Sequence, residues 1–108
     1  MNDINTGRSS VKCTVLLLAI AFGGTAMADD MAAAEKARTL CAGCHGPDGI
    51  SVNPLWPSLA GQHAQYLAKA MGDYKSGARN EPTMSAIAAT LTDAELEALA
   101  AHYANLPR

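Results

Sequence analysis

Cys41-Ala42-Gly43-Cys44-His45 lies near the middle of a chain of 108 residues and has the form Cys-x-x-Cys-His. Two cysteines three positions apart can place both sulfurs along one edge of a flat macrocycle, where each thiolate adds to one haem vinyl group. The next residue, His45, is then carried beneath the ring, where its imidazole can ligate the iron. Because this spacing is typical of c-type haem attachment, we expect one covalent haem c and its iron at this stretch.

Three other kinds of site could use such a cysteine pair. A redox-active disulfide normally occurs in a βαβ context, and no strand pattern is present. A structural zinc ion needs four ligands, and no second paired set follows in the sequence. A plain disulfide between Cys41 and Cys44 would close a very short loop and add little stability. The histidine directly after the second cysteine favours haem over all three.

The N-terminus has the three parts of a secretory signal peptide. A polar stretch with two basic residues over 1–12 precedes an apolar run over 15–22, and Ala26-Met27-Ala28 supplies the small residues that a signal peptidase reads. The apolar run is too short to span a bilayer as a mature helix, although an uncleaved anchor is the alternative interpretation. We therefore predict a cleaved signal peptide over residues 1–28 and one domain over 29–108.

Export also fits the predicted cofactor, because c-type haem is attached outside the cytoplasm. Cys13 precedes the apolar run and is expected to leave with the signal, so that only Cys41 and Cys44 remain. Residues 29–108 carry six Lys and Arg against nine Asp and Glu, and no basic patch suggests nucleic acid. The sequence thus predicts a periplasmic protein with no stable membrane span in its mature chain.

Helical patterns account for most of the predicted domain. Alanine and straight-chain residues over 31–40 favour a helix that runs into the cysteine motif, with Asp29 and Asp30 at its positive end. A second apolar stripe predicts a helix over 61–76, which Gly77 would end. No strand alternation appears. We expect an all-α fold, with three main helices and loops wrapped around one haem.

The last predicted helix follows Leu91 and ends near Asn105. Thr92 and Glu95 have the spacing of a capping box, in which each side chain bonds the other residue's backbone amide. Between the second and last helices, residues 78–85 contain a proline and are expected to form a loop.

A sixth iron ligand must come from elsewhere in the chain. Met84 lies in the expected loop, 39 residues beyond His45, which is far enough to wrap around the ring. Met71 lies on the apolar stripe of the predicted 61–76 helix, a position more typical of a core residue. His63, His102, water or an open position are the remaining alternatives.

Four motifs in order make the chain resemble a family. They are Cys41 to Gly46, Pro57-Ser-Leu-Ala-Gly-Gln62, Met84 followed by Leu91-Thr-Asp93, and Leu99-Ala-Ala-His-Tyr-Ala104. With them the chain resembles the class I c-type cytochromes of the small, exported, monohaem bacterial type (cytochrome c-553/c4-like), which makes residues 29–108 a cytochrome c domain.

The resemblance assigns roles to individual residues. It implies thioethers at Cys41 and Cys44, His45 as the proximal ligand and Met84 as the distal one. It also implies that the Pro57 carbonyl accepts a hydrogen bond from the far ring nitrogen of His45.

A His/Met pair leaves no open iron position, so we expect a one-electron carrier and not an enzyme. The expected partners are exported or membrane-bound redox proteins met in transient encounters, and the chain is expected to be a monomer. Two alternatives remain: a haem sensor or small catalytic haem domain with a dissociable sixth ligand, and a dedicated electron-transfer subunit of a redox enzyme complex.

Overall fold

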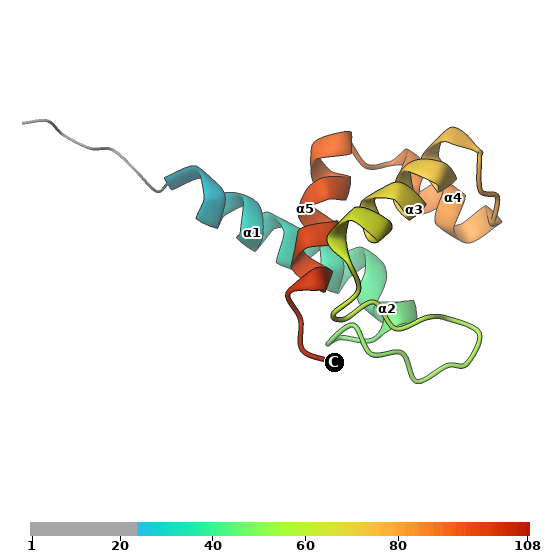
Figure 1. Cartoon of the computed structure of the whole chain (residues 1–108), viewed down its shortest axis with the longest axis horizontal. Helices are drawn as coiled ribbons and strands as arrows, with labels where there is room; N and C mark the ends of the chain where they lie inside the picture. The colour runs from blue at the N-terminus through green and yellow to red at the C-terminus, as the bar shows by residue number, and fades with distance from the viewer. Residues whose placement is uncertain (1–23) are drawn as a thin grey trace, which may run out of the picture.

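The computed structural model describes residues 24–108, and within that range it is all-helical (Figure 1). The helices in chain order are α1 (Gly24–Lys36), the π-helical turn η1 (Ala37–Cys41), α2 (Ala42–His45), α3 (Ala64–Ser76), α4 (Pro82–Ala89) and α5 (Asp93–Ala104). A long irregular segment joins α2 to α3. The predicted all-α class is therefore confirmed. No helix in this part of the chain is long and apolar enough to cross a membrane.

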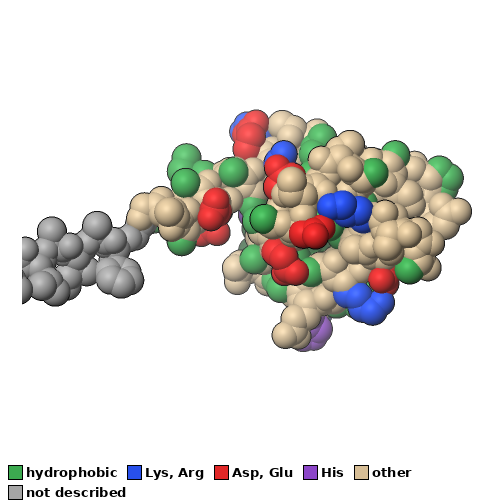
Figure 2. All heavy atoms as spheres, turned by 90° about the horizontal axis from the view of Figure 1, so that it is seen from above, with side chains coloured by type: hydrophobic (Ala, Val, Ile, Leu, Met, Phe, Trp, Pro, Cys, Tyr) green, Lys and Arg blue, Asp and Glu red, His purple; other side chains and the backbone are tan. Residues whose placement is uncertain are grey.

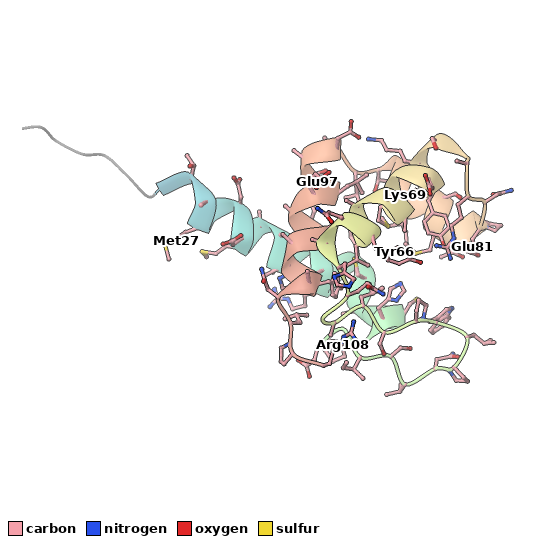
Figure 3. The ribbon with its side chains drawn as sticks, viewed as in Figure 1. Met27, Tyr66, Lys69, Glu81, Glu97 and Arg108 are labelled. Carbon is pink, nitrogen blue, oxygen red and sulfur yellow. The ribbon has the colours of Figure 1, made fainter. Side chains whose placement is uncertain are left out.

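Helix α1 begins further upstream than the sequence predicted. It starts at Gly24, because Thr25 to Ala28 continue the alanine-rich pattern without a helix-breaking residue. In the uncleaved chain Asp29 and Asp30 therefore lie inside the helix and not at its N-terminal end, where the sequence had placed them. The first turns of α1 extend away from the rest of the described chain, and Met27 lies there with 73% of its surface exposed (Figure 3). Residues 1–23 of the predicted signal peptide lie outside the described part of the chain.

The cysteine motif begins in a wide turn. Over η1 the backbone widens, and the amide of Ala42 donates to the carbonyl of Ala37, five residues back. Such π-helical turns are short and often mark functional sites. After the short helix α2 the chain reverses at Gly46, whose φ of 87° lies in the left-handed region. A Cβ at Gly46 would collide with the carbonyl oxygen of Ile50, so only glycine allows this turn directly after His45.

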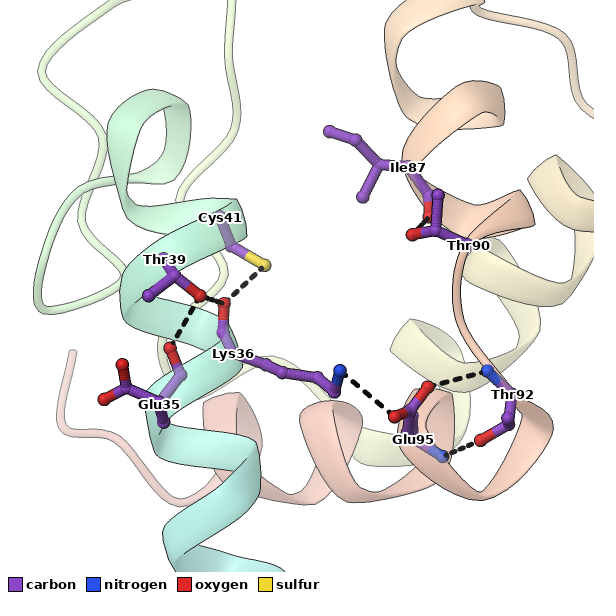
Figure 4. Close-up of polar contacts among 8 residues, drawn as sticks. All are labelled: Glu35, Lys36, Thr39, Cys41, Ile87, Thr90, Thr92 and Glu95. Atoms are coloured by element: carbon purple, nitrogen blue, oxygen red, sulfur yellow. Dashed lines mark hydrogen bonds and ion pairs between the residues drawn. The ribbon is translucent and has the colours of Figure 1, made fainter.

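Small side chains let the first and last helices approach closely. Ala33 and Ala37 are each only 4% exposed, and α1 packs against α5. Lys36 reaches across and forms an ion pair of 3.1 Å with Glu95 (Figure 4). Helix α5 also packs against α3, which in turn packs against α4. The core that these contacts form consists of Ala37, Leu67, Leu91, Leu96, Leu99, Ala100 and Tyr103.

Helix α4 corrects the prediction of a loop over 78–85. Pro82 occupies the first helical turn, where its missing N–H leaves no bond unmade. Glu81 is the N-cap, and its carboxylate accepts a hydrogen bond of 2.8 Å from the Met84 amide. Proline therefore starts a helix here instead of preventing one, and Met84 lies on that helix.

The other predicted helix ends agree better with the structure. Gly77 ends α3 in the left-handed conformation, with φ of 84°. The capping box of α5 is confirmed: the Glu95 amide donates to Thr92 Oγ1 at 3.2 Å, and the Thr92 amide donates to Glu95 Oε2 at 2.9 Å (Figure 4). Helix α3 begins at Ala64 and not at Gly61, which adopts a positive φ of 68°.

We expect Thr92→Ala to lower the free energy of unfolding by about 1 kcal/mol, because it removes the side-chain oxygen that satisfies the Glu95 amide. Denaturant unfolding of the haem-loaded protein, followed by circular dichroism, measures this loss. Thr92→Ser keeps the oxygen and serves as the matched control. Equal stability of the alanine and serine variants would contradict a stabilising capping box.

Candidate functional site

A single cavity of about 510 Å³ brings together all five residues that the sequence singled out. Cys41, Cys44, His45, Pro57 and Met84 all line it, although they come from η1, α2, the 46–63 segment and α4. Its volume lies within the range of about 300–1,000 Å³ that is usual for cofactor sites. Most of the remaining lining side chains are apolar or aromatic: Leu40, Leu55, Trp56, Leu59, Tyr66, Leu67, Ala70, Met71, Tyr74, Ile87, Leu99, Ala100 and Tyr103.

His45 is held in one orientation. Its side chain is buried, with 7% exposed, and its Nδ1 lies 2.7 Å from the carbonyl oxygen of Pro57. Because a carbonyl can only accept, Nδ1 carries the proton and donates, and Nε2 has the free lone pair. Nε2 makes no hydrogen bond with any residue of 24–108. Every fully buried side-chain nitrogen or oxygen in this range does have a hydrogen-bond partner, so Nε2 is not fully buried and is accessible from the cavity. His45 is thus set up to ligate a metal through Nε2.

The segment that follows Pro57 holds the Pro57 carbonyl in position. The amides of Leu59 and Ala60 both donate to the carbonyl of Gly49, at 2.8 and 3.0 Å. The Gly61 amide donates to the backbone of α5 at 2.9 Å. These bonds fasten the segment to the turn after α2 on one side and to α5 on the other. The acceptor for His45 is therefore held by the fold and not by a mobile loop.

Both cysteines are free thiols that share the cavity lining, so the disulfide alternative is not what the structure contains. Burial raises the pKa of the Cys41 thiol, and the neighbouring Tyr103 hydroxyl partly offsets this by hydrogen bonding. Burial also raises the pKa of Tyr103. The Cys41 sulfur lies 4.0 Å from the Lys36 carbonyl oxygen in the widened turn (Figure 4). Two unpaired sulfurs are thus available to one macrocycle.

Of the side chains that the sequence offered as a sixth ligand, two methionines line the cavity. Met84 from α4 and Met71 from α3 both line the cavity, and Met71 also packs against the core. His63 is the exposed N-cap residue of α3 and is not among the lining residues. His102 also lies outside the lining, and its ring packs edge-on against Tyr103 with centroids 5.2 Å apart.

Two charged residues of the lining were not identified from the sequence. Arg79 and Glu81 come from the connection between α3 and α4, and the guanidinium carbon of Arg79 lies 4.6 Å from the ring centroid of Tyr74. Neither residue belongs to a recognisable motif, and the expected loop gave no sign of which of its exposed side chains would line the cavity. Glu81 lies at the end of the molecule away from Met27 (Figure 3).

The side chains present fit a covalently attached haem. Two thiols, an oriented imidazole and a methionine sulfur reach the same apolar cavity. No large side chain of residues 24–108 is completely buried, so the protein core alone is modest and leaves room for a large flat cofactor. The helical fold and this set of side chains together define a small haem protein of the c type.

The chain belongs to the cytochrome c family, whose model, described as "Cytochrome c", matches residues 31–107. It is 46% identical over 80 residues to cytochrome c4 of Thiocapsa roseopersicina, which covers 74% of this chain and 41% of that protein. It is 37% identical over 81 residues to cytochrome c-554(548) of Halomonas halodenitrificans, covering 72% of this chain and 98% of the relative.

A solved structure agrees with this assignment. The crystal structure of reduced recombinant cytochrome c4 from Pseudomonas stutzeri matches with a TM-score of 0.67 and 32% identity, over 75% of this chain and 50% of that one. The chain thus spans about half or less of the cytochrome c4 proteins that it resembles. Family membership confirms three predictions: a class I, c4-like c-type cytochrome, a covalent haem c with its iron, and an electron-transfer protein in place of an enzyme.

We expect the polypeptide without haem to be largely unfolded, because the cavity would remain as a large void in a small core. The Cys41→Ala/Cys44→Ala variant, expressed without haem attachment, tests this by far-ultraviolet circular dichroism. The haem-loaded wild-type chain is the reference for native helix content. Native-like helix content and cooperative unfolding of the haem-free variant would contradict the prediction.

Proposed function

We propose that this chain is a periplasmic one-electron carrier in which His45 and Met84 are the two axial ligands of the haem iron. The observation that carries the proposal is that both side chains line the cavity that also holds Cys41 and Cys44. The haem supplies one-electron chemistry, in which the iron alternates between its ferric and ferrous states. With both axial positions taken by the protein, no site is left for a substrate, and both states can keep the same ligands.

The hydrogen bond from His45 to Pro57 supports a fixed proximal ligand. A donor nitrogen that is bonded to a carbonyl keeps its proton, fixes the ring plane and raises the basicity of the other nitrogen. Because the 57–61 segment is hydrogen-bonded on two sides, it would hold the acceptor for His45 in place in both oxidation states of a bound haem. Pro57 therefore acts as a positioning residue for the iron site.

The position of Met84 favours a carrier over a sensor or a catalytic haem domain. A dissociable ligand needs a segment that can move, whereas Met84 lies in the first turn of α4. That turn is held by the Glu81 cap and by the preset backbone angle of Pro82. A methionine ligand also stabilises ferrous iron and so raises the reduction potential.

A dedicated electron-transfer subunit of a redox enzyme is the second candidate function. Relatives include a protein named thiosulfate dehydrogenase electron acceptor from Stutzerimonas stutzeri, 43% identical over 75 residues, and a cytochrome subunit of sulfide dehydrogenase from Chlorobaculum tepidum, 37% identical over 68 residues. The chain spans 35% and 61% of these two proteins. The chemistry at the haem would be unchanged, and only the lifetime of the complex with the partner protein would differ.

We further propose that the chain is exported and that cleavage after Ala28 leaves residues 29–108 as the working protein. The described part of this signal, residues 24–28, forms the exposed start of α1. The first buried residue of the helix is Ala33, so removing this start takes no side chain from the core. Cleavage and folding are therefore compatible.

Four exposed apolar side chains around the cavity form the proposed docking surface, which we call the apolar rim: Leu40, Leu55, Trp56 and Tyr66. All four side chains are uncharged. Figure 2 shows basic and acidic side chains interspersed on the face of the molecule seen from above. A transient encounter of a monomer with exported or membrane-bound redox proteins would bury less than about 1,200 Å² in such an interface. Charge steering of the encounter should be weak.

Met84→Ala should abolish the ferric methionine–iron absorption band, because no other residue offers a thioether from α4. Optical spectra of the exported protein in both oxidation states measure this change. Met71→Ala is the matched control, since it removes the other methionine of the same cavity and should keep the band. A band that survives Met84→Ala, or one that disappears with Met71→Ala, would overturn the assignment of Met84.

Leu55→Asp should lower the rate constant for reduction by detergent-solubilised respiratory membranes by about fivefold, which corresponds to about 1 kcal/mol. Val52→Asp adds the same charge to the same segment at a fully exposed residue outside the cavity lining, and should change the rate little. Raising the ionic strength from about 0.01 to about 0.1 M should change the wild-type rate by less than about twofold. Equal effects of both substitutions, or a steep salt dependence, would contradict docking through the apolar rim.

A further inference from the structure

We propose that Arg79 is the residue that binds a haem propionate, held ready for that carboxylate by the ring of Tyr74. This inference rests on the proposed haem site and adds a role that neither the cysteine motif nor the axial ligands supply. A haem c brings two carboxylates into its site. Their negative charge near an apolar cavity is unfavourable unless a cation or hydrogen-bond donors meet it.

Among residues 24–108, Arg79 is the only Lys or Arg that lines the cavity. The one carboxylate of the lining, Glu81, accepts a hydrogen bond from the Met84 amide at 2.8 Å and caps α4. The cavity thus presents one permanent positive charge and one negative charge that is already engaged. A carboxylate that enters the cavity has Arg79 as its available cationic partner.

The other basic side chains of residues 24–108 are engaged elsewhere. Four form ion pairs within the chain, and Arg108 donates to the Gly61 carbonyl at 2.8 and 3.1 Å. The guanidinium of Arg79 makes no ion pair or side-chain hydrogen bond with any residue of this range. The four pairs are Lys36–Glu95, Arg38–Glu35, Lys69–Asp73 and Lys75–Asp93.

Tyr74 and the local backbone hold Arg79 in place before any carboxylate arrives. The guanidinium carbon lies 4.6 Å from the Tyr74 ring centroid, which is within the range of a cation–π contact. The Arg79 amide donates to the Asp73 carbonyl at 2.9 Å, after the chain turns at Gly77. A cation–π contact engages none of the guanidinium N–H groups as hydrogen-bond donors, so they remain available to a carboxylate.

The placement of Arg79 along the chain also suits a propionate. In haem the two propionates are carried by the pyrrole rings that do not carry the vinyl groups, so they lie at the edge away from the thioethers. Cys41 and Cys44 belong to η1 and α2, whereas Arg79 lies in the connection between α3 and α4, at the end of the molecule away from α1 (Figure 1). The cysteines and the cation thus reach the cavity from different elements.

A positive charge beside the haem also affects the electron equilibrium. Ferric iron carries one more positive charge than ferrous iron, so a nearby cation disfavours the ferric state. Arg79→Gln should therefore reduce the equilibrium constant for reduction by about threefold, or about 28 mV for one electron, given about 59 mV per tenfold change. Potentiometry on the exported holoprotein measures this shift.

Lys69→Gln is the matched control, because it removes the same charge from α3 at an exposed side chain that is not part of the cavity lining. It should change the equilibrium constant by less than about 1.3-fold. Arg79→Lys keeps the charge and should recover most of the wild-type potential. A shift with Arg79→Gln no larger than that with Lys69→Gln would overturn the proposal.

Resonance Raman spectra of the ferrous holoprotein separate contact with the propionate from a distant effect of charge. Hydrogen bonding to a propionate shifts its bending bands, so Arg79→Gln should move a band that Lys69→Gln leaves in place. Unchanged propionate bands in Arg79→Gln would overturn the contact even if the potential falls. The wild-type spectrum tests the proposed function separately, because a high-spin iron there would refute the His45/Met84 ligation. A low-spin iron in the wild type, combined with unaltered propionate bands in Arg79→Gln, would refute the role of Arg79 alone.

Discussion

The orientation of the His45 ring depends on one hydrogen bond, 2.7 Å long, between its Nδ1 and the Pro57 carbonyl. This bond connects the end of α2 to the segment that leads into α3, across 12 residues of irregular chain. That segment is in turn bonded to the turn after α2 and to α5. The imidazole orientation therefore depends on backbone contacts with the last helix of the fold. If His45 ligates the iron as proposed, a ring fixed in this way would need little rearrangement between the two oxidation states.

The protein core consists in large part of small side chains. Ala33, Ala37, Ala88 and Ala100 are buried, and they bring helices close together without filling much volume. The larger apolar side chains gather around the cavity, where a flat macrocycle would cover them. We therefore expect the chain to gain much of its hydrophobic stabilisation from the cofactor in addition to contacts among its own residues. Covalent attachment through two cysteines makes that dependence permanent.

Helix α4 shows how a local pattern can be misread. Pro82 suggested a loop, whereas Glu81 and Pro82 together form the start of a helix. The sequence predicted that Met84 could reach the haem, although it misjudged the backbone that carries it. The helical setting strengthens the functional interpretation, because a capped turn holds a sulfur more rigidly than an irregular loop. Helix α1 was misjudged for the opposite reason: its alanine-rich pattern continues upstream into the predicted signal, and composition marks no boundary there.

The sequence by itself determined the cofactor chemistry, the helical class and the capping box at Thr92, because each depends on residues within a few positions of one another. It also made Met84 a candidate ligand through its position in the chain, and the resemblance to a family added the predicted roles of Met84 and Pro57. Only the tertiary structure decided which side chains share the cavity. It placed Met71 and Met84 in the lining of one cavity, left His63 and His102 outside that lining, and brought Arg79 and Tyr74 to it. Those placements depend on how α3, α4 and α5 pack against one another, and contacts between residues far apart in the chain leave no periodic signal in the sequence.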